Sequence, residues 1–143
     1  MSNIFLDTIN GNSSSRPPVW FMRQAGRILP SYRKLKEKHH FYDMMKDSEL
    51  ASEVTLLPIN DLDVDSAILF SDILVIPDAL GLELIFTKNG PKFTNAITEI
   101  NHNHLNFNPE KLSYIYKNIE KTVENKKDTP PVSYTHLTLP TNA

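Results

Sequence analysis

The arginine residues of this chain are confined to one short segment. All four arginines lie between Arg16 and Arg33, and the other basic side chains are eleven lysines. An arginine guanidinium holds a carboxylate or phosphate through two parallel hydrogen bonds, which the ammonium group of lysine cannot reproduce. The grouping of Arg23, Arg27 and Arg33 therefore indicates an anion-binding site, with surface ion pairing as the alternative interpretation.

A carboxylate occupies a comparable position after the second apolar run of the sequence. Asp72 follows Ala67–Phe70 closely, as Arg23 and Arg27 follow the apolar run Val19–Met22. In proteins built on parallel strands, reactive side chains lie just past the carboxyl ends of the strands. These three side chains are therefore candidates for one site, although Asp72 also suits the cap of a helical turn after the strand.

Charge is distributed unevenly along the chain. Residues 1–50 carry eight basic and five acidic side chains, whereas residues 51–90 carry one lysine against seven acids. The formal net charge is −2 and the isoelectric point is about 6.2. Nucleic-acid-binding proteins usually carry a basic surplus, so this balance argues against a nucleic-acid partner.

Length and composition exclude several classes of protein. A chain of 143 residues can form one domain with a core and is too short for two. The absence of cysteine excludes disulfides, thiolate metal sites and a cysteine nucleophile. Apolar runs of only about four residues exclude a membrane span, and residues 1–7 lack the features of a secretory signal. We therefore expect a reducing, cytoplasmic location.

The first half of the chain predicts two strands and several helices. Val19–Met22, which follows two prolines, is typical of a short strand buried on both faces. Asp47 or Ser48 is placed to cap a helix that Pro58 ends or kinks, with the apolar stripe Leu50, Val54 and Leu57. The other expected elements are a helical turn at 3–9, loops at 9–18 and 24–27, an exposed helix over Ser31–His39 and a strand over Ala67–Phe70.

The second half is expected to contain one well-defined helix. Pro109 suits the first helical position, and the spacing after it predicts a helix over 109–125 whose apolar stripe packs in the core, namely Leu112, Ile115, Tyr116, Ile119 and Val123. The remaining expectations are an irregular or helical segment at Ile73–Leu80, a short strand at Leu84–Phe86, a turn at Asn89–Pro91 and a linker at 126–131 that leads into a strand. Alternation of buried strands with helices indicates an α/β fold with a parallel sheet.

The last residues differ in character from the rest. Residues 132–143 are rich in threonine, leucine and proline and resemble the translation of transposase-adapter DNA from sequencing libraries. We therefore expect two parts, a native segment at 1–131 and a non-native tail at 132–143 without function. The alternative is a genuine edge strand over Tyr134–Leu139.

Two long blocks carry a family resemblance. The segment Arg16–Arg33 resembles the N-terminal signature of uroporphyrinogen decarboxylases, and Thr55–Pro58 with Asp65–Gly81 resembles a second block of that family. The resemblance extends over residues 1–131. Because the family forms a (β/α)8 barrel, it implies an α/β chain that is the N-terminal part of a TIM barrel and is incomplete by itself.

The resemblance also implies a reaction. The family removes carbon dioxide from the four acetate side chains of uroporphyrinogen III, giving coproporphyrinogen III for haem synthesis, without a metal or an organic cofactor. By motif, Arg23 and Arg27 bind substrate carboxylates, Gln24, Ala25 and Gly26 line the cleft, and Asp72 binds the pyrrole N–H groups and stabilises the cationic intermediate. Arginine suits a substrate with eight carboxylates, and a fixed carboxylate suits positive charge on a protonated pyrrole.

The resemblance has departures and limits. Ile28, Ser31 and Leu57 replace an aromatic residue, an acid and a glutamine of the family pattern, and Asn60-Asp61 replaces a basic pair. The family's remaining site residues fall beyond Pro131. We therefore expect the isolated chain to be unstable and inactive, with the sheet edge after Ala67–Phe70 unpaired, and the parent enzyme to be a homodimer that binds a tetrapyrrole, without nucleic-acid or membrane partners.

Other site types are weighed against this interpretation. His39-His40 and the pair His102 and His104 are expected to be solvated, and Asp61, Asp63 and Asp65 lack the glycine and glutamate of a calcium loop, so they predict a solvated turn. Two alternative functions remain open. One is a barrel for cobalamin-linked methyl transfer, which typically carries zinc-binding histidine and cysteine sets, and the other is a non-catalytic anion-binding fragment.

Overall fold

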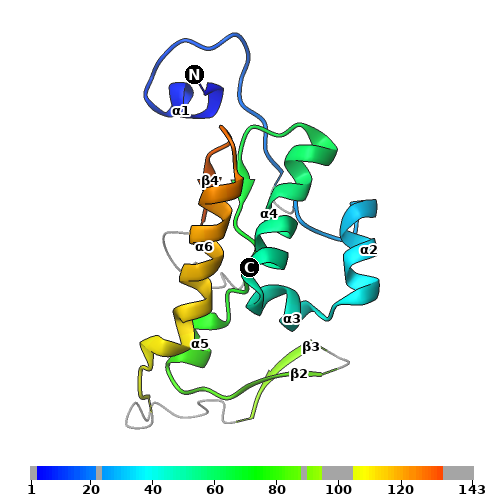
Figure 1. Ribbon diagram of the computed structural model, residues 1–143. Helices are drawn as coiled ribbons and strands as arrows, with labels where there is room; N and C mark the ends of the chain where they lie inside the picture. Colours follow the sequence, from blue (N-terminus) through cyan, green and yellow to red (C-terminus); the bar gives the residue numbers. More distant parts are fainter. Residues whose placement is uncertain (1–2, 22–23, 88–89, 95–104, 134–143) are drawn as a thin grey trace, which may run out of the picture.

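The computed structural model describes residues 3–21, 24–87, 90–94 and 105–133. Within these ranges the helices are α1 (Ile4–Ile9), α2 (Pro30–Lys38), α3 (Phe41–Lys46), α4 (Ser48–Leu62), α5 (Val75–Ala79), the 3-10 helix η2 (Pro109–Leu112) and α6 (Ser113–Asn125). The strands are β1 (Ala67–Ile68), β2 (Leu84–Thr87), β3 (Gly90–Phe93) and β4 (Pro131–Val132) (Figure 1). None of the helices in these ranges is long and apolar enough to cross a bilayer.

A parallel strand pair lies at the centre of the fold. β1 pairs with β4 in parallel, with Ala67 opposite Pro131 and Ile68 opposite Val132. The amide of Leu69 extends the pairing by donating to the Val132 carbonyl at 2.9 Å. α6 lies between the two strands in sequence and packs along α4 (Figure 1). The α/β class is therefore confirmed, and the strand after the 126–131 linker is present.

The β1–β4 pair also corrects one expectation about the sheet edge. One edge of β1 is paired, whereas the sequence suggested an unpaired edge after Ala67–Phe70. Val132, the first residue of the proposed non-native tail, takes part in this pairing through its backbone carbonyl. Backbone groups of almost any residue can pair in this way, so the origin of 132–143 remains a prediction. The alternative strand Tyr134–Leu139 lies outside the described residues.

β2 and β3 form a separate antiparallel pair. Leu84 lies opposite Phe93, and Thr87 lies opposite Gly90. Gly90 has a φ of 110°, a backbone conformation that side-chain-bearing residues rarely adopt, which explains glycine at the start of β3. The predicted strand Leu84–Phe86 is confirmed and extends to Thr87.

The predicted buried strand Val19–Met22 is wrong for the residues that the structure describes. Val19, Trp20 and Phe21 belong to no sheet and are 44 %, 48 % and 52 % exposed. The two prolines ahead of Val19 carry no N–H to pair with a neighbouring strand. The Val19 amide donates to the Asp65 carboxylate at 2.6 Å, and the Val19 carbonyl accepts from the Asp65 amide at 2.9 Å. These two bonds tie the segment to the residues just before β1.

Helix α4 begins where the sequence predicts and continues further than expected. The Asp47 carboxylate accepts from the amides of Glu49 and Leu50 at 2.9 and 3.1 Å, which satisfies two N–H groups of the first turn. Pro58 is buried inside the helix and does not end it, because the chain remains helical to Leu62. Burial of the proline ring in the core offsets the loss of its amide donor.

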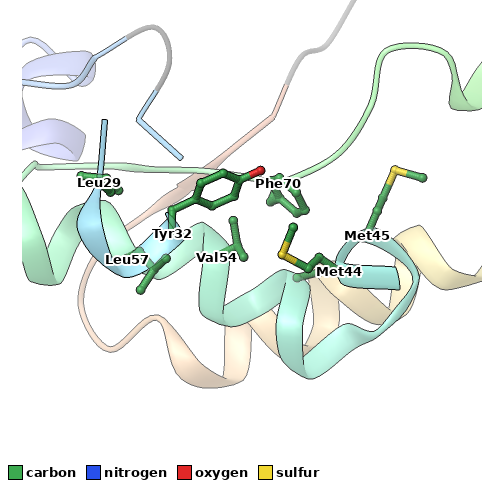
Figure 2. Packing of buried hydrophobic residues seen from close by; sticks show 8 residues of the cluster. Leu29, Tyr32, Met44, Met45, Val54, Leu57 and Phe70 are labelled. Carbon is green, nitrogen blue, oxygen red and sulfur yellow. The ribbon is translucent and has the colours of Figure 1, made fainter. Parts of the chain in front are cut away.

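The core is built on one face of α4. Val54 and Leu57 point from α4 toward Tyr32 and Phe70, and Met44 and Met45 of α3 complete the cluster (Figure 2). The remaining members are Leu29 and Ala51. Val54 and Leu57 therefore confirm the predicted stripe of α4. The six-residue helix α3 was not predicted, because Phe41–Lys46 is too short to show a helical period.

The predicted core stripe of the 109–125 helix is largely wrong, although the helix itself is confirmed as η2 followed by α6. Tyr116, Ile119 and Val123 are 56 %, 39 % and 48 % exposed. The side chains that α6 buries are Asn118 and Thr122.

Hydrogen bonds account for only part of this inward polar face, because the Asn118 side-chain oxygen and the Thr122 hydroxyl are buried without a hydrogen-bond partner among the described residues. The Asn118 amide donates to the Met45 carbonyl at 2.7 Å, and that of Asn125 donates to the Ser52 hydroxyl at 3.2 Å. Ala51 and Ser52 are small, so α6 can approach α4 closely enough for these bonds. The spacing of apolar residues in 109–125 therefore predicted the wrong face of α6 as the one that packs against α4.

Thr55 links α4 to the end of β1 and allows a stability prediction. Its buried hydroxyl donates to the Ala51 carbonyl at 2.7 Å and accepts from the Phe70 amide at 2.9 Å. Thr55→Val keeps the shape but leaves the buried Phe70 amide without an acceptor, which costs about 1–3 kcal/mol. We expect urea unfolding of Thr55→Val to show that loss, and Thr55→Ser to remain near wild type. Equal stability of Thr55→Val and the wild type would contradict this account.

Candidate functional site

A cavity of about 800 Å³ lies at the carboxyl end of β1. One wall is formed by Ile68–Ser71, which continue from β1, and the opposite wall is formed by residues 24–28. Tyr32 of α2 and Phe41 of α3 complete the lining. The cavity therefore lies past a parallel strand, where such folds place their binding sites.

The loop at 24–28 is held in place by its own hydrogen bonds. Gln24 is 2 % exposed, its side-chain oxygen accepts from the Phe21 amide, and its amide nitrogen donates to the Ser66 carbonyl, both at 2.9 Å. The Leu29 amide donates to the Gly26 carbonyl at 3.0 Å, which closes a turn directly before α2. Gln24 therefore attaches the loop to β1 as well as lining the cavity.

The arginines separate into different roles. Arg27 is exposed and lines the cavity. Arg33 donates to the carbonyls of Arg27 and Ile28 at 2.9 and 3.4 Å, so its guanidinium supports the loop. Arg16 pairs with Asp65. Arg23 lies outside the described residues. Among the arginines that the structure describes, Arg27 is therefore the one placed to bind an anion in the cavity.

Aromatic rings form the inner wall of the cavity. Phe70 makes edge contacts with Tyr32 and Phe41, with ring centroids 6.4 and 5.4 Å apart. Burial raises the pKa of the Tyr32 phenol, and the nearby Arg27 charge opposes that rise. Tyr32 is therefore a neutral phenol at physiological pH. The cavity lining thus combines three aromatic side chains, packed edge to face, with the cationic side chain of Arg27.

Asp72 borders the cavity and shapes the turn that follows it. It is the next residue after Ser71, which lines the cavity, and it lies outside the lining itself. Its Oδ1 atom accepts from the Leu74 amide at 2.8 Å, two residues on, in the turn before α5. The N-cap residue of α5 is Leu74, so Asp72 does not cap the helix itself, and a role toward a ligand remains a prediction.

A tyrosine lies near the same carboxylate. Burial first, and then the nearby groups Tyr42, Asp78 and Asp72, raise the pKa of Tyr114 to about 12. Tyr114 is therefore a protonated phenol at physiological pH, close to the acidic turn that contains Asp72 and Asp78. Its ring also faces the ammonium group of Lys46, 5.7 Å from the ring centroid.

Sequence reasoning located part of this site. Gln24, Ala25, Gly26 and Arg27 were predicted and line the cavity. Tyr32, Phe41, Phe70 and Ser71 also line it and were not assigned to the site. Phe70 and Ser71 adjoin the predicted Asp72 and were detectable from that position, whereas Phe41 belongs to the short helix α3, for which the sequence carries no periodic signal.

The predicted solvated turn at Asp61, Asp63 and Asp65 is wrong at Asp65. This carboxylate is 10 % exposed and accepts from Arg16 Nη1 and Nη2 at 2.6 and 2.8 Å. Asp61 accepts from the Ser31 hydroxyl, and Asp63 ends α4 with a φ of 53°. In the part of the chain that the structure describes, no three metal-ligating side chains come together. His102 and His104 lie outside it.

The Asp65 carboxylate gives a pH prediction. Its hydrogen bonds to Arg16 and then to the Val19 amide lower its pKa below the ordinary 3.8. A carboxylate with a lowered pKa stabilises the fold above its ordinary pKa, and that contribution is lost as the pH falls through the folded value. We expect the difference in unfolding free energy between wild type and Asp65→Asn to be constant near pH 7 and to shrink below about pH 4. A difference that does not change with pH in urea titrations would contradict this.

The described residues define an α/β chain with a cavity past a parallel strand, lined by Arg27 and by aromatic side chains. The family model described as Uroporphyrinogen decarboxylase (URO-D) matches residues 2–135. The chain therefore belongs to the uroporphyrinogen decarboxylase family.

Individual relatives agree with this family. A uroporphyrinogen decarboxylase of Sulfurovum sp. is 48 % identical over 126 residues, which are 84 % of this chain and 36 % of that protein. One of Christiangramia forsetii is 40 % identical over 135 residues, covering 92 % of this chain and 40 % of the relative. One of Legionella pneumophila (strain Lens) is 46 % identical over 119 residues, covering 80 % and 34 %. The chain spans somewhat more than a third of the length of these relatives.

Proposed function

We propose that the enzyme to which these residues belong decarboxylates the four acetate side chains of uroporphyrinogen III and yields coproporphyrinogen III for porphyrin and haem synthesis. The observation that carries the proposal is the cavity past β1, whose lining includes Arg27, Phe70 and Ser71, in a member of this family. Relatives of similar sequence bear the name of this enzyme. No metal or organic cofactor is part of the proposal.

The cavity lining supports a role for Arg27 and the aromatic side chains, and the roles of Arg23 and Asp72 rest on the family motif. Arg27 at the rim holds a substrate carboxylate through its planar guanidinium, and Arg23, four residues earlier in the sequence, holds another. Tyr32, Phe41 and Phe70 exclude water and pack against the ring system. Asp72 accepts the pyrrole N–H groups on the side of its carboxylate that is turned away from Leu74.

The charge of Asp72 then supplies the chemical step. Protonation of a pyrrole carbon places positive charge on the ring, which withdraws the electron pair of the breaking C–C bond as carbon dioxide leaves. A fixed carboxylate beside the pyrrole nitrogen stabilises that charge as it develops. Loss of carbon dioxide leaves an exocyclic methylene group, which takes up a second proton from solvent to become the methyl group, and loss of the first proton from the ring carbon restores the pyrrole, so that each turnover consumes one proton. Each acetate would undergo the same sequence.

The 143-residue chain is proposed to be the N-terminal part of a (β/α)8 barrel and inactive alone. A complete barrel takes roughly 250 residues, and a chain of this length cannot close one. The proposed native segment is 1–131. The complete enzyme is proposed to be cytoplasmic and homodimeric, with a tetrapyrrole as its substrate and without nucleic-acid or membrane partners.

The test uses an extended chain, in which residues 1–131 are followed by the remainder of the Sulfurovum sp. relative. We expect the extended chain to convert uroporphyrinogen III to coproporphyrinogen III, and the 143-residue chain to show no turnover. Turnover by the 143-residue chain would contradict its proposed inactivity. An extended chain that folds without converting uroporphyrinogen would contradict the proposed reaction, and cobalamin-dependent methyl transfer or bare anion binding would then replace it.

A further inference from the structure

We propose that Asp65 is a positioning residue, which fixes residues 16–19 beside the start of β1 and, through the hydrogen bond from the Phe21 amide to Gln24, supports the placement of Arg27 in the cavity. The inference rests on the proposed function only in naming what Arg27 binds. Asp65 lies outside the cavity lining, and both oxygens of its carboxylate accept hydrogen bonds from Arg16 or Val19. Its effect on binding passes through the backbone that leads from Arg16 to the loop.

The carboxylate of Asp65 makes three charge-assisted contacts with a segment 46 to 49 residues away in sequence. Arg16 approaches it with both guanidinium nitrogens, at 2.6 and 2.8 Å, and the Val19 amide donates to it at 2.6 Å. The backbone amide of Asp65 donates in turn to the Val19 carbonyl at 2.9 Å. Hydrogen bonds that involve an ionised partner are roughly twice as strong as neutral ones. The Asp65 side chain is therefore fully engaged with residues 16–19.

The next residue of the chain holds the other end of the same segment. The Ser66 carbonyl accepts from the buried Gln24 side chain at 2.9 Å, and Gln24 accepts from the Phe21 amide at 2.9 Å. Asp65 and Ser66 thus anchor the chain at Val19 and at Gln24, on either side of Arg23. Ala67 follows immediately as the first residue of β1. Asp65 and Ser66, which directly precede β1, therefore hold Val19 and Gln24, and the residues at the carboxyl end of the same strand line the cavity.

Residues 19–21 depend on polar contacts for their attachment, because their apolar side chains are only partly buried. Val19, Trp20 and Phe21 are about half exposed, so apolar burial holds them only in part. Loss of the Asp65 charge removes the Arg16 ion pair and weakens the Val19 contact together. The Gln24 anchor remains, so the fold is retained while the loop gains freedom. Asp65 therefore controls the placement of Arg27 more than the stability of the core.

Limited trypsin digestion of the extended chain tests the placement directly. In Asp65→Asn we expect cleavage after Arg23 and Arg27 to accelerate about tenfold, while cleavage after Lys126 and Lys127 is unchanged. Glu53→Gln is the matched control, because Glu53 is an exposed acid on α4, and it should cleave like the wild type. Unchanged cleavage after Arg23 and Arg27, or equal acceleration at all four positions, would overturn the proposal.

Kinetics of the extended chain separate positioning from a general structural role. For Asp65→Asn we expect the KM for uroporphyrinogen to rise about tenfold and kcat to stay within about twofold. Arg16→Lys, which keeps the charge but loses the second nitrogen, should give a smaller rise in KM. A fall in kcat with KM unchanged would indicate loss of folded enzyme and would overturn the proposal. If the unsubstituted extended chain has no activity, the proposed reaction fails and the digestion result alone decides the role of Asp65.

Discussion

Asp72→Asn in the extended chain is expected to lower kcat for uroporphyrinogen by about 10²- to 10³-fold without unfolding the protein. The substitution removes the negative charge that faces the developing positive charge of the pyrrole ring, and losses of this size follow removal of one preorganised electrostatic partner. An amide group of the same size cannot stabilise that charge. The effect belongs to the chemical step, so it should appear in kcat more strongly than in KM.

The structure explains why this variant should fold. Asp72 Oδ1 accepts from the Leu74 amide, and an asparagine oxygen accepts the same hydrogen bond. The turn into α5 is therefore retained. Circular dichroism and urea unfolding of Asp72→Asn should match the unsubstituted extended chain while steady-state rates fall. Near-normal rates would show that the Asp72 charge has no part in the reaction and that its hydrogen bond from the Leu74 amide is its only role.

Arg27→Lys in the extended chain is expected to lower kcat/KM by about 10- to 100-fold. Lysine keeps the positive charge but cannot form two parallel hydrogen bonds to a carboxylate, and charge-assisted hydrogen bonds contribute about 1.5–3 kcal/mol each. The Arg27 side chain is exposed and its backbone carbonyl, not its guanidinium, holds Arg33. The substitution therefore leaves the loop contacts in place.

The Arg27 prediction has a matched control on the neighbouring helix. Lys36 lies on α2 and is exposed, and it does not line the cavity. Lys36→Arg exchanges the same two residue types in the opposite direction and should leave kcat/KM within about twofold. If kcat/KM of Arg27→Lys also stays within twofold of the unsubstituted chain, Arg27 does not bind a substrate carboxylate through two parallel hydrogen bonds. A single positive charge at this position is then sufficient.

Elements that depend on local signals were predictable from the sequence. The cap at Asp47, the start of a helix near Pro30 and the helix after Pro109 each follow from a residue type in a specific position. The loop at 24–28 was assigned to the site because a long motif identified it. The sequence placed this loop past a strand at Val19–Met22, whose described residues form no strand, although Arg27 does line a cavity together with the residues that follow β1.

Elements that depend on distant partners were not predictable. Val19–Phe21 is apolar enough for a buried strand, but the neighbour that holds it is Asp65, 46 residues away. Tyr116, Ile119 and Val123 have the spacing of a core stripe, yet α4 meets the opposite face of α6, where Asn118 finds the Met45 carbonyl. Periodicity shows that side chains of one kind share a face, and it cannot show which face meets a neighbour.

Distant partners also decided which residues of the site could be predicted from the sequence. Arg16 and Arg33 are of the residue type that binds anions, and both bind groups of the protein instead. Residue type alone could not separate them from Arg27, because the difference lies in what each guanidinium meets in three dimensions. Asp65 was hidden for the same reason, since it stands in an acidic run that looked solvated.

A crystal structure of the extended chain with coproporphyrinogen bound would test the central claim most directly. We predict that the tetrapyrrole occupies the cavity between residues 24–28 and Phe70, with Asp72 accepting its pyrrole N–H groups and Arg27 paired with a propionate. A tetrapyrrole bound elsewhere, or one that meets neither Arg27 nor Asp72, would contradict the account.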